Sequence, residues 1–320
     1  LHCLESLQII MLLFARHTTR IATGLFAILF TQFSFSQQQT FTPTHDTSMH
    51  MEYLSEISLV GSGQQRDVMM LPEVVGTKIN AGKKNSLVVM DQLNTIVANN
   101  SMRQILAKVP GIHIWESDGS GIQIGIANRG LSPNRSWELN TRQNGYDISS
   151  DVFGYPEAYY NPPLEAVETI ELVRGGSSLQ FGPQFGGMLN YILKREMKKK
   201  FSFETQNTVG SYGLMSSYNA IGGKYKNFSY YVYNHSRSAD GWRENSEYTV
   251  RNTHAFAEYR FSENTKLSAE YTNMDYQMQQ PGGLTDEQFN DNPRQSFRDR
   301  NWFGTPWNVF SLQLDTKINY

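Results

Sequence analysis

The sequence predicts an α+β domain followed by antiparallel strands of a transmembrane β-barrel. After Lys200, long segments alternate between apolar and polar residues, as from Lys266 to Tyr271, and a period of two is typical of strands with two different faces. Short turns join these segments on one side, and a long polar loop at 281–306 joins them on the other. Tyrosines near the strand ends complete the pattern of an outer-membrane barrel.

Composition excludes several other classes of protein. A chain of 320 residues has room for two domains, and its net charge of -2 gives no reason to expect a nucleic-acid partner. The one cysteine, Cys3, lies in a segment that we expect to be removed, so no disulfide framework is expected. The seven histidines show no paired ligand spacing. We therefore expect no bound metal and no cofactor.

The N-terminus predicts an export signal, residues 1–36. Basic residues at 16–20 precede an apolar run at 21–35 that ends in Ser-Phe-Ser, with small residues where a signal peptidase requires them. This run is too short to span a bilayer comfortably. Because the chain opens with Leu1, a translation start at Met11 is an alternative.

Residues 37–70 predict a flexible leader, since 37–52 are polar and lack periodicity. Within it, the segment 53–61 (YLSEISLVG) is short and rich in apolar residues. A lone segment of this kind cannot form a stable sheet, but it can add as a strand to the sheet edge of a partner.

A folded domain is predicted for 71–197. Ser101 is a candidate cap for a helix that runs to Val109 and stops at Pro110 and Gly111. Strands are predicted at 112–115 and, from the alternation of isoleucines, around 122–126.

The stretch 167–194 is the most distinctive part of this domain. It predicts a strand, a set of tight glycine turns and a second strand at 188–193. Glycine permits positive φ and close approach of two backbones, so we expect backbone packed against backbone here.

This stretch resembles the end of the plug domain of TonB-dependent outer-membrane receptors. The resemblance rests on an ordered set of residues: Glu168-x-Ile170-Glu171-x-x-Arg174-Gly175, Ser178-x-x-Phe181-Gly182 and Gly186-Gly187-x-x-Asn190-x-Ile192. It implies an α+β plug domain followed by antiparallel transmembrane β-barrel strands from about residue 198. It also implies that these residues are structural in the plug: Arg129, Glu168, Glu171, Arg174, Gly175, Gly182, Gly186 and Gly187.

A second set of residues resembles the branch related to ferric dicitrate receptors. It comprises Asn134-Arg135-Ser136-Trp137, the segments 142–149 and 154–157, and the loop 282–304. Other branches have Leu-Asp-Gly where this chain has Gln143-Asn144-Gly145. The branch implies a ferric chelate as substrate, with the iron already chelated and without direct protein ligands.

Ferric citrate is anionic, and arginine binds carboxylates with a planar, permanently charged fork. The candidate substrate-binding residues are Asn134, Arg135, Arg142, Gln143, Arg294, Arg298 and Arg300. For Arg135 and Arg142, binding substrate and bracing the plug stay open as alternatives. The loop arginines could instead pair with nearby carboxylates at the surface. We expect Arg129 to be buried and to stabilise the plug. We expect Arg174 to form an ion pair with a carboxylate of the plug or the barrel and so to hold the plug in place.

The resemblance further implies partners and location. One segment of the leader resembles a TonB box; its residues are Ser55, Glu56, Ile57, Ser58, Leu59, Val60 and Gly61. We therefore expect a monomer in the outer-membrane lipid of a bacterium, energised by TonB with ExbB and ExbD. An enzyme is not expected, because Gly119-Ser120-Gly121 lacks the spacer residues of a nucleophile elbow.

The strand count limits this interpretation. A barrel that encloses a plug has about 22 strands, and this sequence supplies roughly six. We therefore expect a truncated N-terminal fragment of a receptor. The alternatives are a passive structural or adhesive outer-membrane barrel and a fragment without function.

Overall fold

The computed structural model describes residues 67–76, 78–80, 85–150, 158–195 and 199–317, all within one compact unit. The predicted export signal (1–36) and the TonB-box-like segment (55–61) lie outside the described residues. No helix in the described part of the chain is long and apolar enough to cross a membrane.

The first domain is built on a mixed sheet with the strand order β1-β4-β9-β10-β7-β8. Only β10 and β7 pair in parallel. Buried Ile170, Leu172, Leu189 and Tyr191 on the two central strands make its core. The strands are β1 (Val68–Met69), β4 (Ser86–Val89), β7 (Leu139–Gln143), β8 (Tyr146–Asp147), β9 (Val167–Val173) and β10 (Gly187–Leu193).

Two hairpins and several short helices complete this domain. The hairpins pair β2 (Val74–Val75) with β3 (Lys78–Ile79), and β5 (Ile112–Glu116) with β6 (Ile124–Asn128). The helices are η1 (Met90–Gln92), η2 (Val97–Asn99), α2 (Met102–Ile105), η3 (Asn134–Ser136), η5 (Leu164–Ala166) and η6 (Gly175–Gln180). Strand β5 confirms the alternation predicted from the sequence, whereas β6 is a strand whose residues are all buried.

The predicted helix from Ser101 to Val109 is wrong in length and in its cap. Helix α2 ends at Ile105, and the Ser101 side chain makes no capping bond. Its hydroxyl instead donates to Glu116 Oε1 (2.8 Å), which also accepts from the backbone N–H of Arg103 (3.1 Å). A carboxylate from β5 thus satisfies a free N–H at the start of the helix. Val109 is still buried, as its apolar spacing requires.

The predicted close packing of backbones is confirmed at two glycines. A Cβ placed on Gly186 would lie 2.2 Å from the carbonyl oxygen of Glu138, and one on Gly187 would lie 2.6 Å from that of Val173. Gly187 also has φ +137°. Neither position can hold a larger residue without movement of the backbone.

The second part of the chain is an antiparallel sheet of seven strands, and the predicted six long strands are confirmed. They are β11 (Ser202–Val209), β12 (Met215–Tyr225), β13 (Phe228–Ala239), β14 (Tyr248–Arg260), β15 (Thr265–Gln279) and β17 (Trp307–Thr316), with the short β16 (Trp302–Gly304) in addition. Strands β16 and β17 pair with different parts of β15. Pro306 lies between them and has no N–H to donate, which explains the interruption.

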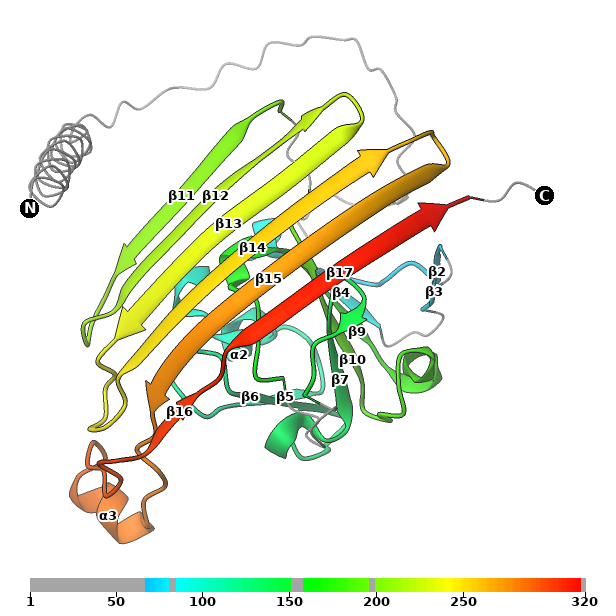
Figure 1. Cartoon of the computed structure of the whole chain (residues 1–320). Coiled ribbons are helices and arrows are strands. Elements are labelled where there is room, and N and C mark those ends of the chain that lie inside the picture. Colours follow the sequence, from blue (N-terminus) through cyan, green and yellow to red (C-terminus); the bar gives the residue numbers. More distant parts are fainter. Residues whose placement is uncertain (1–66, 77, 81–84, 151–157, 196–198, 318–320) are drawn as a thin grey trace, which may run out of the picture. The chain divides into compact units, whose positions relative to one another are not determined.

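The connections differ between the two ends of this sheet. At one end, residues 226–227 and 261–264 make tight turns; at the other, 240–247 and 280–301 form longer loops, the second with helix α3 (Asp286–Asp291) (Figure 1). Short periplasmic turns and longer extracellular loops are the rule in outer-membrane barrels. We call the long-loop end of this sheet its extracellular end, after that rule.

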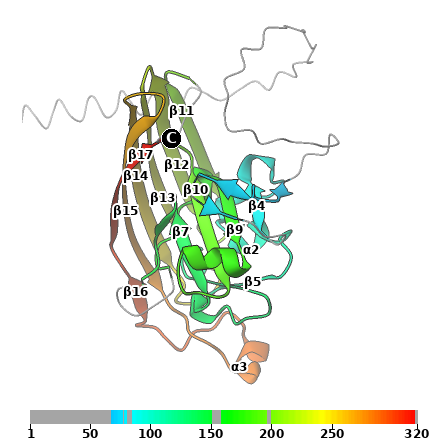
Figure 2. The ribbon, with the colours of Figure 1, turned by 90° about the vertical axis from the view of Figure 1, so that its right-hand side faces the viewer.

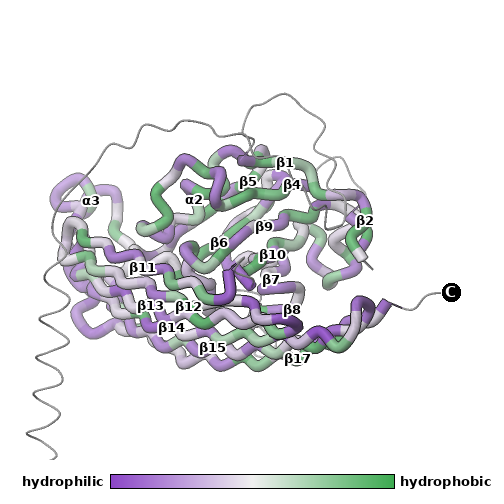
Figure 3. Tube along the Cα trace, turned by 90° about the horizontal axis from the view of Figure 1, so that it is seen from above, coloured by the Kyte–Doolittle hydropathy of each residue, from purple (hydrophilic) through white to green (hydrophobic). Residues whose placement is uncertain are grey.

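The first domain lies against one face of the seven-stranded sheet (Figures 1 and 2). Polar and apolar residues alternate along the strands of that sheet (Figure 3), so one face can meet the domain while the other faces away.

A buried carboxylate joins the two parts. Glu270 on β15 is 3% exposed. It accepts hydrogen bonds from Arg195 Nη2 (2.6 Å) and Asn144 Nδ2 (2.7 Å), and from the Tyr146 hydroxyl (3.4 Å). A buried charge is tolerated when it is paired and its remaining acceptor sites are filled.

Replacing Gly186 with alanine should weaken the sheet locally, because the new methyl group would collide with a carbonyl oxygen. We expect the protection of the β10 amides against hydrogen exchange to fall by about 1–3 kcal/mol. Gly176→Ala is the control, since nothing lies within 4 Å of its added Cβ. Equal protection in both variants would contradict this account.

Glu270→Gln should loosen the domain from the strands, because Arg195 would keep its charge without a partner. We expect a loss of roughly 2–3 kcal/mol, below that for a fully buried pair since Arg195 is partly exposed. The measurement is the denaturant concentration at which the segment around Asn144 becomes sensitive to protease. Glu263→Gln, in an exposed turn, should leave that concentration unchanged. A similar shift in both variants would show that Glu270 does not hold the domain against the strands.

Candidate functional site

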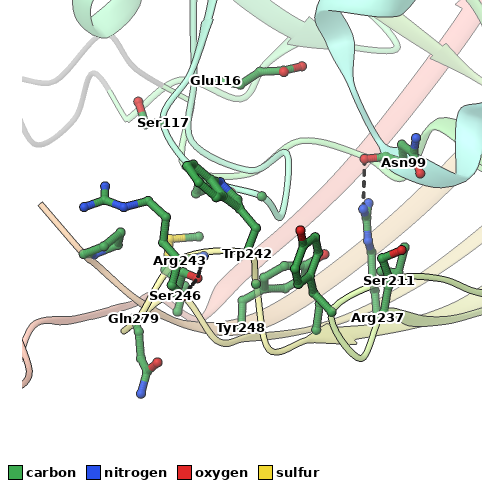
Figure 4. Close-up of a pocket in the computed structure, with 18 of the residues that line it drawn as sticks. Asn99, Glu116, Ser117, Ser211, Arg237, Trp242, Arg243, Ser246, Tyr248 and Gln279 are labelled. Atoms are coloured by element: carbon green, nitrogen blue, oxygen red, sulfur yellow. Dashed lines mark hydrogen bonds between the residues drawn. The ribbon is translucent and has the colours of Figure 1, made fainter. Parts of the chain in front are cut away.

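A cavity of about 560 Å³ lies between loops of the first domain and the extracellular ends of β12 to β15. Figure 4 shows its side chains converging from both parts of the chain. The first domain contributes Asn99, Arg103 and residues 116–119, and the sheet contributes residues 211–214, 237–248 and 278–281 in part. The cavity therefore exists only when the two parts are docked.

Two arginines dominate the sheet side of this cavity. Arg237 on β13 is 4% exposed, and its Nη2 donates to the carbonyl oxygen of Asn99 (2.9 Å; Figure 4). Arg243 donates to the carbonyl oxygens of Gly282 and Gln295, both at 2.8 Å. In each guanidinium the Nε–H is buried without a hydrogen-bond partner. Neither arginine forms an ion pair with another described residue; Arg237 has an electrostatic partner in the buried carboxyl group of Glu165, whose pKa burial raises and the charge of Arg237 lowers.

Aromatic side chains surround these arginines. The ring of Tyr248 lies 5.8 Å from the Arg237 guanidinium carbon, a cation–π distance. Trp242, 46% exposed, and Tyr212 also line the cavity. The site thus combines flat apolar surface with fixed cationic donors, as small-molecule sites commonly do.

The carboxylates in this cavity are held by the first domain. Burial raises the pKa of Glu116, but hydrogen bonds from Arg103 and Ser101 outweigh it and lower that pKa below its usual value. Asp118 accepts from the backbone N–H groups of Ser120 (2.6 Å) and Gln123 (3.0 Å), among others, while burial raises its pKa. Glu116 and Asp118 accept their hydrogen bonds from residues of the first domain, and neither forms an ion pair with Arg237 or Arg243.

A second cavity of about 260 Å³ adjoins the first through Ser117, which lines both. It contains the predicted Asn134 and Arg135, which are exposed. Opposite them is Gln280, whose Nε2 donates to Gln123 Oε1 (3.2 Å). These two of the seven predicted substrate-binding residues therefore line a cavity at the extracellular end.

For Arg142 the structure favours the bracing alternative. Its Nε donates to Asn140 Oδ1 and its Nη1 to the carbonyl oxygen of Gly145, both at 2.6 Å, and its Nη2 donates to the carbonyl oxygen of Phe181. The guanidinium is thus saturated by its own domain.

The prediction that Gln143 binds substrate is wrong for this structure. Gln143 is fully buried. Its Oε1 accepts from the Tyr160 hydroxyl (2.6 Å), and its Nε2 donates to Thr272 Oγ1 on β15 (3.3 Å). Its position on β7 directs the amide into the contact with the sheet, where both ends are occupied.

The three arginines of the long loop are exposed and line neither cavity. Arg294 is nearest to the site: its Nε donates to the carbonyl oxygen of Trp242 (2.7 Å) and its guanidinium lies over Tyr212 (5.6 Å). Arg298 and Arg300 show no such link to a residue that lines a cavity. The loop is therefore joined to the site through Arg294.

Two predictions for structural arginines are also wrong. Arg129 is exposed rather than buried. Arg174 has no carboxylate partner among the described residues; its Nη1 donates to the carbonyl oxygen of Pro110 (2.8 Å) and its Nη2 to Ser86 Oγ (2.9 Å). Burial and the neighbouring Arg129 lower its pKa. Two ion pairs join the two parts among the described residues: Arg195 with Glu270 and Lys194 with Glu204.

The other residues predicted to be structural lie on or near the central strands. Glu171 accepts from Asn190 Nδ2 on the neighbouring strand (2.8 Å), and Glu168 is exposed. Gly175 has φ +81°, a conformation that favours glycine. A Cβ on Gly182 would lie closest to the flexible side chain of Gln184 and also near that of Asn140.

Sequence reasoning missed Arg237, Trp242 and Arg243. One signal was available: Arg237 falls on the same strand face as Tyr231, Tyr233 and His235, all buried. A charged residue in register with a buried face is costly unless it has a role.

Comparison with known proteins identifies the first domain. Residues 78–188 match the family model of the TonB-dependent receptor plug domain. We therefore call this domain the plug.

Solved structures with a similar fold include three receptors. The ferric citrate transporter FecA, unliganded, is 21% identical with a TM-score of 0.63 over 73% of this chain and 37% of its own. The siderophore receptor PirA from Acinetobacter baumannii is 14% identical (TM-score 0.54; 73% and 38%). FpvA from P. aeruginosa, bound to a ferric pyoverdine, is 15% identical (TM-score 0.57; 73% and 32%).

The chain thus spans between 32% and 38% of the length of these structures. Its seven-stranded sheet has the fold of the corresponding part of these structures. Residues 78–188 thus belong to the plug domain family of TonB-dependent receptors, and the chain has the fold of part of such receptors.

Proposed function

We propose that this receptor binds an anionic ferric chelate at the extracellular end of the plug and imports it with energy delivered through TonB. The observation that carries the proposal is the pair Arg237 and Arg243, which line the cavity and form no ion pair with a described carboxylate. Arg237 is buried and Arg243 is partly exposed, and a buried cation is costly without a close partner. An anionic ligand that enters the cavity would supply one.

The geometry of the arginines supports recognition of carboxylates. Carbonyl oxygens hold the Nη groups of both side chains, so the guanidinium planes are fixed before a ligand arrives. Pre-organised donors lose little entropy on binding. The buried Nε–H groups have no hydrogen-bond partner, and a charge-assisted hydrogen bond from a guanidinium to a carboxylate is about twice as strong as a neutral one.

The size of the site suits a small chelate. A cavity of about 560 Å³ falls in the range of about 300–1,000 Å³ typical of small-molecule sites. The structural likeness to a ferric citrate transporter and the resemblance of the 134–149 segment make ferric dicitrate the first candidate substrate. Asn134 and Arg135 would then contact it from the plug, across the second cavity.

Energy would come from the inner membrane through TonB, with ExbB and ExbD, by way of the segment Ser55–Gly61. This assignment is supported by the plug match and by the strand-forming character of the segment. A passive structural or adhesive barrel has no need of a plug, so the plug argues for transport.

Arg243→Gln should weaken the binding of ferric dicitrate to the full-length receptor by roughly 10- to 100-fold, since it removes one charge-assisted contact of about 1.5–3 kcal/mol. Isothermal titration calorimetry measures the change. Arg300→Gln is the matched control, because this arginine is exposed and lines neither cavity. Wild-type affinity of the Arg243 variant, or an equal loss in the control, would exclude the proposed site.

Deleting residues 55–61 from the full-length receptor should abolish uptake of radiolabelled ferric chelate by cells and leave its binding affinity unchanged. A deletion of equal length in the polar leader, 40–46, should preserve both. Uptake that survives the first deletion would show that this segment does not contact TonB.

A further inference from the structure

The side chain of Arg243 is oriented by the long loop 280–301. Its Nη1 and Nη2 donate to the carbonyl oxygens of Gly282 and Gln295, both at 2.8 Å, and neither acceptor lines one of the two cavities. The backbone of Arg243 is fixed separately, because its N–H donates to Ser246 Oγ (3.2 Å), which lies beside it in the cavity wall (Figure 4). Its own loop therefore carries Arg243 into the cavity, and the long loop orients its guanidinium group.

This orientation requires both arms of the long loop to be in place. Gly282 precedes helix α3 and Gln295 follows it, so the two acceptors of the guanidinium group come from opposite arms. An arginine that loses such acceptors regains rotamer freedom, and ligand binding must then remove that freedom at a cost in affinity. Most of the long loop lies outside the cavity wall, yet the pre-organisation of the site depends on it.

Asn245 fastens both arms of the long loop to the loop 240–247. Its Nδ2 donates to the carbonyl oxygen of Gln280 (3.2 Å), before helix α3, and to that of Arg298, after it. The carbonyl oxygen of Asn301 lies 3.5 Å from the same nitrogen. An amide group has two N–H donors, so this one side chain can bond both arms at once.

The backbone of Asn245 suits this role. Its φ is +53°, in the left-handed region that asparagine and aspartate adopt more readily than other residues with a side chain. Asn245 is partly exposed and lines neither cavity. The position thus combines a positive φ with a pair of donors, and asparagine supplies both.

A second link joins the same two loops. The N–H of Glu244 donates to the carbonyl oxygen of Arg294 (2.8 Å), and Glu244 Oε2 accepts from the N–H of Ser296 (3.2 Å). These bonds hold the segment 294–296, which contains one of the two acceptors of Arg243. They reach only the second arm of the long loop, so the first arm depends on the neighbouring asparagine.

We propose that Asn245 is a positioning residue of the chelate site, which fastens both arms of loop 280–301 and so holds the acceptors that orient the Arg243 guanidinium group. Asn245 itself makes no contact with the ligand in this arrangement. Its effect on affinity rests on the proposed function, whereas its effect on the long loop is independent of any substrate.

Asn245→Asp tests this role, because it keeps the size of the side chain and the tolerance for positive φ but removes both donors. Asn245→Gly is a second variant that permits the same backbone and places no carboxylate among the carbonyl oxygens. Both should weaken the binding of ferric dicitrate to the full-length receptor by about 2- to 12-fold, the cost of ordering one side chain on binding. Asn264→Asp, in the exposed turn 261–264, is the control and should bind like the wild type in isothermal titration calorimetry.

A double-mutant cycle separates positioning from a general structural role. If Asn245 acts through Arg243, then Asn245→Asp should cause no further loss of affinity in a receptor that already carries Arg243→Gln. An equal loss with and without Arg243 would overturn the inference, as would wild-type affinity of both Asn245 variants while Arg243→Gln binds weakly. Wild-type affinity of Arg243→Gln itself would instead exclude the proposed chelate site, and with it any effect of Asn245 on that site.

The fastening of the long loop can be measured without substrate. A spin label at Asn290→Cys, exposed on α3, should become more mobile when Asn245→Asp is added, and a label at Ser262→Cys, in the turn at the other end of the sheet, should not change. The one native cysteine, Cys3, falls in the predicted export signal. Unchanged mobility at position 290 would show that Asn245 does not hold the loop and would overturn the inference, whichever ligand the receptor binds.

Discussion

The buried carboxylate of Glu270 is the contact on which the rest of the arrangement depends. It lies on the inner wall of the strand sheet and takes hydrogen bonds from three plug residues, Asn144, Tyr146 and Arg195. Gln143 adds a bond to Thr272 on the same strand. A charge in this position is stable only while its partners are present. Docking of the plug therefore buries Glu270 and at the same time supplies the hydrogen bonds that replace its water.

This contact also defines the candidate site. The cavity has one wall from the plug and one from the strands, so it takes shape as a consequence of docking. The bond from Arg237 to the Asn99 carbonyl crosses the same boundary. Any rearrangement that frees the plug must change the surroundings of Arg237. A ligand bound in this cavity would therefore be coupled to the position of the plug through shared residues, which is the physical requirement for signalling between the two.

Polar and aromatic side chains share this boundary. Glu270, Gln143 and Arg237 are hydrogen-bonded across it, and the ring of Tyr160 stacks on that of Trp307 with centroids 6.2 Å apart. Water can replace such hydrogen bonds at modest net cost, whereas separating the aromatic contacts would expose apolar area to water. Separation of the plug from the strands would therefore be opposed mainly by the aromatic contacts.

The sequence alone determined that a folded domain is followed by long antiparallel strands, because period-two alternation and glycine turns are encoded within a few neighbouring residues. It also indicated that arginines are candidate binding residues. Which arginines do so was decided by tertiary structure: Arg237 meets Asn99 across 138 positions of sequence, and Arg195 meets Glu270 across 75. Tertiary structure also decided how the helix after Ser101 is capped, because Glu116 from β5 accepts the hydrogen bond from the N–H that Ser101 was expected to bind. Local patterns specify which face a side chain occupies, but its partner depends on strand register and docking, which bring distant residues within a few ångströms.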